Sequence, residues 1–247
     1  MPSMPDLIQR ACGTGELALD LLYPRHCQHC GAPADAARFF CWECLSDFHY
    51  IQPPFCSLCG DPVPGHIDHE YRCVFCSRKR PSFDGARSAV RYEGAAGLSI
   101  RAIKYQSATW LIPDLTALLE ACLRAHYDLL PFDAVCYVPL HAVKQRERGF
   151  NQAEMLARGL ARARRLPLQM NLLRRIKDAG SQTRLTASQR ASNVSGVFRA
   201  ARPQRTEGLK LLLVDDVMTT GATVNECARM LKGAGAESVH VLTVARG

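Results

Sequence analysis

The chain has 247 residues, of which 47% are hydrophobic and 22% are charged, and this composition excludes disordered, collagen-like and coiled-coil proteins. Its length allows one main hydrophobic core and a smaller accessory module. No apolar run approaches eighteen residues, and Asp6, Arg10, Glu16 and Asp20 interrupt the N-terminal segment. We therefore expect a cytoplasmic protein without membrane insertion. The 31 basic and 23 acidic residues give a formal net charge of +8, which favours polyanionic partners such as nucleic acids or phosphorylated small molecules.

Eight of the twelve cysteines form four C-x-x-C pairs. Such a turn brings two thiolates within reach of one tetrahedral ion, and two turns complete a closed structural zinc site. Ten residues separate the first two pairs and thirteen separate the last two, so each gap fits a short hairpin. We predict two consecutive zinc ribbons over residues 24–80, although spacing alone leaves an interleaved pairing open. The predicted ligands of two structural Zn²⁺ ions are Cys27, Cys30, Cys41, Cys44, Cys56, Cys59, Cys73 and Cys76.

Other chemistries suit this cysteine pattern less well. A cytoplasmic chain disfavours disulfides, and a thioredoxin-like site needs one C-x-x-C pair in a βαβ setting rather than four in series. An iron–sulfur cluster is a minor alternative. Because closed four-cysteine sites have no open coordination position, we expect the ribbons to be structural or to form a binding surface. Four nearby histidines are expected to be bystanders and four single cysteines to be core thiols, namely His26, His29, His66 and His69, and Cys12, Cys122, Cys136 and Cys227.

The remainder of the chain alternates candidate strands and helices, as an α/β domain requires. After an N-terminal helical segment at 1–23 and the ribbons, the polar and basic residues 77–81 are predicted to be a linker, so that the second domain spans 82–247. The run L-K-L-L-L-V is nearly all apolar, which is typical of the central strand of a parallel sheet. Strands are predicted at 86–92, 132–138, 209–214 and 239–244, and helices at 98–105, 110–127, 152–165 and 224–231.

Two adjacent acids, Asp215 and Asp216, follow the predicted central strand in the segment V-D-D-V-M-T-T-G-A-T. Carboxylates in this position can accept hydrogen bonds from a vicinal diol. The small and hydroxylated residues 219–223 leave backbone amides free and direct a helix N-terminus toward an anion. Because α/β sheets bind ligands where strands end and because unliganded adjacent carboxylates are costly, the pattern favours a site for a ribose 5-phosphate.

The same segment closely resembles the phosphoribosyl pyrophosphate (PRPP) binding motif of type I phosphoribosyltransferases. Together with the ribbons, the segment V-P-L-H-A-V-K-Q-R-E-R-G-F-N-Q and residues 173–198, the chain resembles the ComF family over essentially its whole length. The resemblance implies an α/β, type I phosphoribosyltransferase fold, a parallel sheet flanked by helices, preceded by a small double zinc-ribbon module with four-cysteine sites. It also implies PRPP with Mg²⁺ as ligand, a role in DNA uptake and natural transformation, and single-stranded DNA and a competence-machinery protein as partners.

The resemblance also assigns site residues. The loop at 139–151 corresponds to the pyrophosphate-binding loop, residues 174–193 correspond to the flexible loop that closes over PRPP, and Lys104 resembles a lysine common in the family's early helix. The implied PRPP-binding residues are Asp215, Asp216, Val217, Met218, Thr219, Thr220, Gly221, Ala222, Thr223, Lys144, Arg146, Arg148, Arg184 and Lys104. Further donors expected from the flexible loop are Arg174, Arg175, Lys177, Gln182, Thr183, Gln189, Arg190 and Asn193.

Two classes of function follow from the resemblance. In a glycosyltransferase, ribosyl C1 passes through an oxocarbenium-like transition state as pyrophosphate departs with Mg²⁺, and the catalytic residues Asp215 and Asp216 orient and support the ribose. The acceptor is unidentified, with a nucleic-acid component as one example. A glutamine-dependent transferase is not expected, because the chain begins Met1-Pro2-Ser3 instead of with a nucleophilic cysteine. The alternative is a non-catalytic factor that handles single-stranded DNA or senses PRPP.

Overall fold

The computed structural model describes residues 25–34, 38–177 and 196–247. Its contacts divide the chain into two compact units, Met1–Phe48 and His49–Gly247. The predicted helical segment at 1–23, with Cys12, lies outside the described residues. So does the middle of the predicted flexible loop, with Gln182, Thr183, Arg184, Gln189, Arg190 and Asn193. Within the described ranges, every helix is too short or too polar to cross a bilayer.

The first unit is built from a cysteine-containing turn and the short helix α2 (Trp42–Ser46). The backbone N–H of Gly31 donates to the carbonyl of Cys27 at 2.9 Å, and Gly31 adopts a φ of 75°, which closes the turn. Cys41 precedes α2 and its sulfur accepts a hydrogen bond from the backbone of Cys44 at 3.5 Å. The described part of this unit has few residues and buries little apolar surface, which makes metal binding its main available source of stability.

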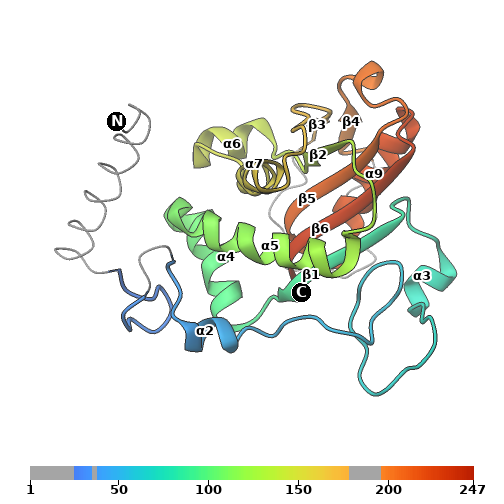
Figure 1. The fold of residues 1–247 in the computed structure, drawn as a ribbon. Coiled ribbons are helices and arrows are strands. Elements are labelled where there is room, and N and C mark those ends of the chain that lie inside the picture. The colour runs from blue at the N-terminus through green and yellow to red at the C-terminus, as the bar shows by residue number, and fades with distance from the viewer. Residues whose placement is uncertain (1–24, 35–37, 178–195) are drawn as a thin grey trace, which may run out of the picture. The chain divides into compact units, whose positions relative to one another are not determined.

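The second unit contains a sheet of four parallel strands, as predicted (Figure 1). Its order is β1 (Gly85–Arg91), β6 (Ser238–Arg246), β5 (Lys210–Met218) and β2 (Ala134–Tyr137). The predicted central position of β5 is confirmed, and its apolar residues 211–214 are fully buried. β5 continues four residues beyond its predicted end, because residues 215, 217 and 218 stay in register with β6.

Helices cover both faces of this sheet. One face carries α5 (Ile112–Tyr127), which packs on β1 and β6, and α7 (Gln152–Arg164), which packs on β2 and β5 (Figure 1). On the opposite face, α9 (Ala222–Gly233) shares a buried cluster with alternate residues of β5, including Leu211 and Leu213. The helix α4 (Gly94–Gln106) and the short turn η1 (Thr109–Leu111) connect β1 to α5. Such three-layer packing explains why the strands read as continuous apolar runs.

Several local elements differ from the sequence-based expectation. The predicted loop at 139–151 contains a helix, α6 (Ala142–Arg148), which ends at Gly149 with a φ of 82°. Arg174 and Arg175, predicted in a flexible loop, lie in β3 (Leu173–Arg175), which pairs antiparallel with β4 (Phe198–Ala200). A three-residue strand is too short to show a periodic pattern, so its hydrogen-bonded partner decides its conformation. The turn η2 (Pro203–Arg205) follows β4.

The second cysteine-rich turn, followed by the helix α3 (Val74–Arg78), is packed on the sheet of the second unit. The backbone N–H of Ala86 in β1 donates to the carbonyl of Leu58 at 2.7 Å. At Gly60 a Cβ atom would lie 2.6 Å from the carbonyl oxygen of Ala86, and its φ is 67°, so this close approach requires glycine. Three of the predicted core thiols, Cys122, Cys136 and Cys227, are buried as expected.

Candidate ligand site and metal centres

The structure contains two groups of four cysteines, each of which brings its four sulfur atoms within 4.8 Å of one another. They combine the pairs consecutively, so the interleaved pairing that spacing left open is absent. Neither group includes His26, His29, His66 or His69, which agrees with their expected role as bystanders. Four thiolates at these distances are the donor set of a closed structural zinc site. The members are Cys27, Cys30, Cys41 and Cys44 in the first group, and Cys56, Cys59, Cys73 and Cys76 in the second.

Backbone amides stabilise the thiolate of Cys56 in the second group. The N–H of Cys73 donates to the sulfur of Cys56 at 3.3 Å. Burial alone would raise the pKa of the Cys56 thiol, but backbone N–H groups of Cys59, Cys73 and Leu58 lower it to about 7. Because the thiolate is the form that binds metal, these amides favour the ligand form of Cys56, whereas burial raises the pKa of Cys59 in the same turn to about 12.

The acidic pair lies inside the sheet, near the end of β5. Asp215 is 8% exposed and Asp216 is 5% exposed. The ammonium group of Lys104, from α4, forms an ion pair with Oδ2 of Asp216, and Nε2 of Gln152 donates to Oδ1 at 3.4 Å. Oδ1 of Asp215 instead accepts from the backbone N–H of Asp216 at 2.9 Å. The two neighbouring acids therefore occupy different environments.

These environments shift the two pKa values in opposite directions. Burial and the charge of Asp216 raise the pKa of Asp215 well above its ordinary value. Burial alone would also raise the pKa of Asp216, but the ammonium of Lys104 lowers it on balance. Burial likewise opposes the charged form of Lys104, and Asp216 outweighs it and raises the pKa of the ammonium. Asp216 is thus held as a charged partner of Lys104, whereas Asp215 is held toward its neutral form.

The loop that follows β5 ends at the N-terminus of α9. Gly221 precedes this helix with a φ of 76°, and a Cβ atom there would lie 2.7 Å from Cε of Met218. The side chains of Thr219 and Thr220 are exposed, and residues 222 and 223 are half-buried. Val217 is half-buried and Met218 is buried, so these two residues would contact a ligand through their backbone rather than through their side chains. The first N–H groups of a helix have no partner within that helix, which makes this loop suited to an anion.

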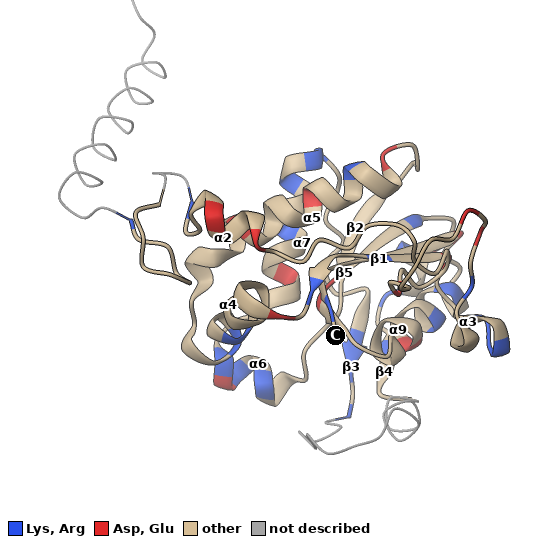
Figure 2. Cartoon of the chain, turned by 90° about the horizontal axis from the view of Figure 1, so that it is seen from below, with Lys and Arg blue, Asp and Glu red and all other residues tan. Residues whose placement is uncertain are grey.

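One basic residue of α6, Arg148, is linked to the acidic pair through Gln152. Nη1 of Arg148 donates to Oε1 of Gln152 at 2.6 Å, so a polar chain runs from Arg148 through Gln152 and Asp216 to Lys104. Lys144 is half-buried and Arg146 is exposed on the same helix, which Figure 2 shows as largely basic. The structure thereby brings part of the predicted pyrophosphate segment to the acids.

Residues of the predicted covering loop contribute less to this cluster. Arg174 is exposed on β3, Arg175 packs its guanidinium 5.7 Å from the ring centroid of Phe198, and Lys177 is exposed. Arg184 lies outside the described residues. Among the residues that the structure describes, Arg174, Arg175 and Lys177 form no hydrogen bond or ion pair with the two acids.

Sequence reasoning missed Gln152 as a site residue. It is the first residue of α7, after Asn151, whose side chain accepts from the backbone N–H of Ala153 at 3.0 Å and caps the helix. The cap fixes the start of α7, and this start places the Gln152 amide beside Asp216 at 3.4 Å. The available signal was its position directly after a basic loop segment at the end of a strand.

Comparisons with known proteins agree with this architecture. The sequence family described as double zinc ribbon domain matches residues 18–78, and the family described as phosphoribosyl transferase domain matches residues 147–247. Competence protein F of Haemophilus influenzae is 30% identical over 226 residues, which cover 89% of this chain and 96% of that protein. DNA utilization protein YhgH of Salmonella typhi is 31% identical over 220 residues, 83% of this chain and 96% of that protein.

Among solved structures, the glutamine PRPP amidotransferase from B. subtilis, complexed with ADP and GMP, matches with a TM-score of 0.37 and 23% identity. The match covers 53% of this chain and 25% of that chain.

Proposed function

Because the chain belongs to the ComF family of competence proteins, we propose that it binds PRPP together with Mg²⁺ at the edge formed by β5, α4, α6 and the N-terminus of α9. One observation carries this proposal. Two buried acids, one held charged by Lys104 and the other held toward its neutral form, stand directly before a loop that leads into a helix N-terminus. Ribose hydroxyls need carboxyl groups as partners and a phosphate needs backbone N–H donors, and both kinds of group lie side by side here.

The residues then have distinct roles toward the ligand. Asp216, fixed by Lys104 and Gln152, accepts a ribose hydroxyl, and Asp215 orients the neighbouring hydroxyl. The loop at 219–223 receives the 5-phosphate through backbone amides. The basic side chains of Lys144, Arg146 and Arg148 face the pyrophosphate, whose charge Mg²⁺ partly neutralises when it is bound. Binding in this manner suits PRPP because the site then holds the phosphates and the ribose diol of the ligand in one fixed geometry.

We further propose that the site transfers the phosphoribosyl group. The charged carboxylate of Asp216 can support positive charge that develops at the ribosyl C1 as pyrophosphate departs, without a covalent intermediate, while Asp215 orients the ribose. The test is release of pyrophosphate from PRPP and Mg²⁺ by the full chain, with and without single-stranded DNA or nucleosides as acceptor. Acceptor-dependent release above the rate of an Asp215→Asn/Asp216→Asn variant supports transfer. Binding without release under every acceptor would leave a PRPP-sensing protein.

A second candidate function, contact with single-stranded DNA, is favoured by one surface of the second ribbon. Phe75 on α3 is 77% exposed, and the basic residues around it are exposed as well, as the blue end of α3 shows in Figure 2. We call this set the α3 surface; it comprises Arg72, Val74, Phe75, Arg78, Lys79 and Arg80. An exposed aromatic ring between cations suits stacking of a base and contact with phosphates.

Changes on the α3 surface have distinguishable expected effects. Phe75→Ala removes a stacking ring, so we expect weaker binding of single-stranded DNA by about 1–3 kcal/mol for every sequence tested. Arg78→Ala with Lys79→Ala removes two phosphate contacts, so the slope of log affinity against log salt should fall by about 1.4. Fluorescence anisotropy with labelled oligonucleotides at several salt concentrations measures both effects.

The control for net charge is Arg124→Ala with Arg158→Ala, two exposed arginines on α5 and α7. This variant loses the same charge as the α3 double variant and should keep the wild-type slope. Equal effects of the two double variants would reject the α3 surface as a specific contact and leave only a general attraction of the basic chain.

A further inference from the structure

We propose that Arg246 is a positioning residue that couples the second four-cysteine site to the phosphate loop of the PRPP site. The identity of the ligand rests on the proposed function, whereas the coupling between the two sites can be tested without a ligand. It assigns the second ribbon a role in ligand binding in addition to stability. The evidence is a continuous set of contacts from Cys59 through Arg246 to Met218, the residue before the phosphate loop.

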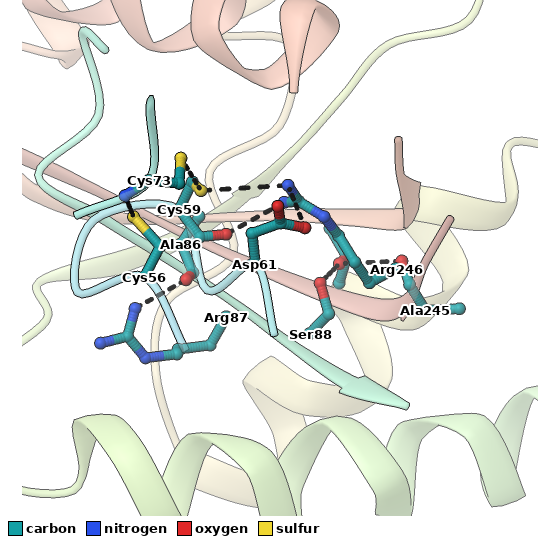
Figure 3. A network of polar contacts seen from close by, with 10 residues as sticks. Cys56, Cys59, Asp61, Cys73, Ala86, Arg87, Ser88, Ala245 and Arg246 are labelled. Atoms are coloured by element: carbon teal, nitrogen blue, oxygen red, sulfur yellow. Dashed lines mark hydrogen bonds and ion pairs between the residues drawn. The ribbon is translucent and has the colours of Figure 1, made fainter. Parts of the chain in front are cut away.

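Arg246 is the last residue of β6, and its side chain reaches the second ribbon (Figure 3). Nη1 donates to the carbonyl oxygen of Cys59 at 3.0 Å, and Nη2 lies 3.1 Å from Oδ1 of Asp61 and 3.9 Å from the sulfur of Cys59. The side chain is only 9% exposed. An arginine with two donors fixed on a metal-ligand segment acts as an outer-shell partner that orients the ligand.

The same strand end supports the ligand loop. Arg246 is paired in register with Met218, the last residue of β5, and the N–H of Gly247 donates to the carbonyl of Met218 at 3.1 Å. Three residues earlier, Thr243 pairs in register with Asp215, and its hydroxyl lies 2.6 Å from that of Ser88. The end of β6 therefore holds both Asp215 and Met218, the residue that precedes the phosphate loop.

An ion held by the second cysteine group orders the turn from Cys56 to Asp61, because the turn supplies two of the four ligands and the carbonyl that Arg246 contacts. Order in this turn is transmitted to β6 through the guanidinium, and from β6 to residues 215–219 through the sheet. Such coupling is reciprocal: a ligand at the phosphate loop strengthens metal binding at the second site.

The test is hydrogen–deuterium exchange of the full zinc-loaded chain, read by mass spectrometry on peptides covering 56–62 and 216–223. Arg246→Met removes both donors at similar length, and Asp61→Asn removes one carboxylate partner that is 44% exposed. We expect both variants to accelerate exchange in the two peptides, by about tenfold for Arg246→Met, with α5 and α7 unchanged. The matched control is Arg164→Met, which breaks a pair with Asp128 at 2.8 Å elsewhere in the unit.

Addition of PRPP and Mg²⁺ completes the test. In the wild type it should slow exchange in both peptides, and in Arg246→Met it should slow only residues 216–223. Unchanged exchange at 216–223 in both variants without ligand overturns the coupling. If the wild type shows no response to PRPP, the proposed function fails, while the comparison without ligand still decides the coupling. Acceleration throughout the unit, α5 and α7 included, would show a general loss of stability and reject the positioning role.

Discussion

Replacing Cys44 by serine is expected to remove the fold of the first unit while the second unit stays folded. Cys44 is buried and is one of four sulfur atoms within 4.8 Å of each other, and the described part of this unit has too few residues for a core of its own. Structural zinc contributes about 10–16 kcal/mol of apparent binding free energy in such small modules. Native mass spectrometry should show two Zn²⁺ ions in the wild type and one in the variant.

The matched control is Cys122→Ser, the same substitution at a buried cysteine of α5 that belongs to neither group. It buries a hydroxyl in an apolar site, which costs about 1–3 kcal/mol without loss of metal. Limited proteolysis should cut residues 25–48 quickly in Cys44→Ser and slowly in Cys122→Ser. Two ions retained in Cys44→Ser would contradict the assignment of the first group.

Asp216→Asn is expected to destabilise the second unit by about 3 kcal/mol and to lower its melting temperature by roughly 10 °C. The reason is that Lys104, only 21% exposed, loses the carboxylate that compensates its buried charge. Thermal unfolding at neutral pH, followed by circular dichroism, measures the change. The cost comes from the uncompensated ammonium, so a second change, Lys104→Met, should recover part of it.

Asp215→Asn is the matched control, and its expected effect has the opposite sign. Because burial raises the folded-state pKa of Asp215 above its ordinary value of 3.8, the folded chain holds this proton more tightly than the unfolded chain. The resulting stabilisation is complete below pH 3.8 and is lost as pH rises through the folded-state pKa. Asparagine does not ionise and therefore loses no stability as pH rises. The variant should have a melting temperature equal to or above that of the wild type at neutral pH.

Asp216 follows the reverse dependence. Its folded-state pKa is lowered, so its contribution is complete above pH 3.8 and is lost as pH falls through the folded-state pKa. The difference in melting temperature between wild type and Asp216→Asn should therefore shrink in acid. Equal destabilisation by the two single substitutions would contradict the different environments described for the acids.

The sequence predicted those elements that leave a local pattern, such as an apolar run or a regular cysteine spacing. The apolar run at 211–214 indicated a central strand, and it is fully buried between β6 and β2. The four C-x-x-C pairs predicted two closed metal sites, because their chemistry depends on local spacing. Short elements such as β3 and α6 escaped prediction, since partner strands and caps decide them more than periodicity does.

The candidate site was predicted in part. Its acids and loop form one continuous motif, whereas Lys104 lies more than a hundred residues away and its pairing with Asp216 depends on how α4 packs. The difference in pKa between Asp215 and Asp216 is also invisible in the sequence, because it arises from burial and from a lysine on another element. Arg246 escaped notice for the same reason: its partners Cys59 and Asp61 come from the ribbon.

The most direct test of the proposed PRPP site is calorimetric titration of the zinc-loaded chain with PRPP in the presence of Mg²⁺, alongside the Asp215→Asn/Asp216→Asn variant. We expect saturable binding of one PRPP per chain in the wild type, and loss of that binding in the variant at a temperature at which the variant remains folded. Equal heats in the two proteins, or no saturable binding in the wild type, would contradict a PRPP site built on these acids.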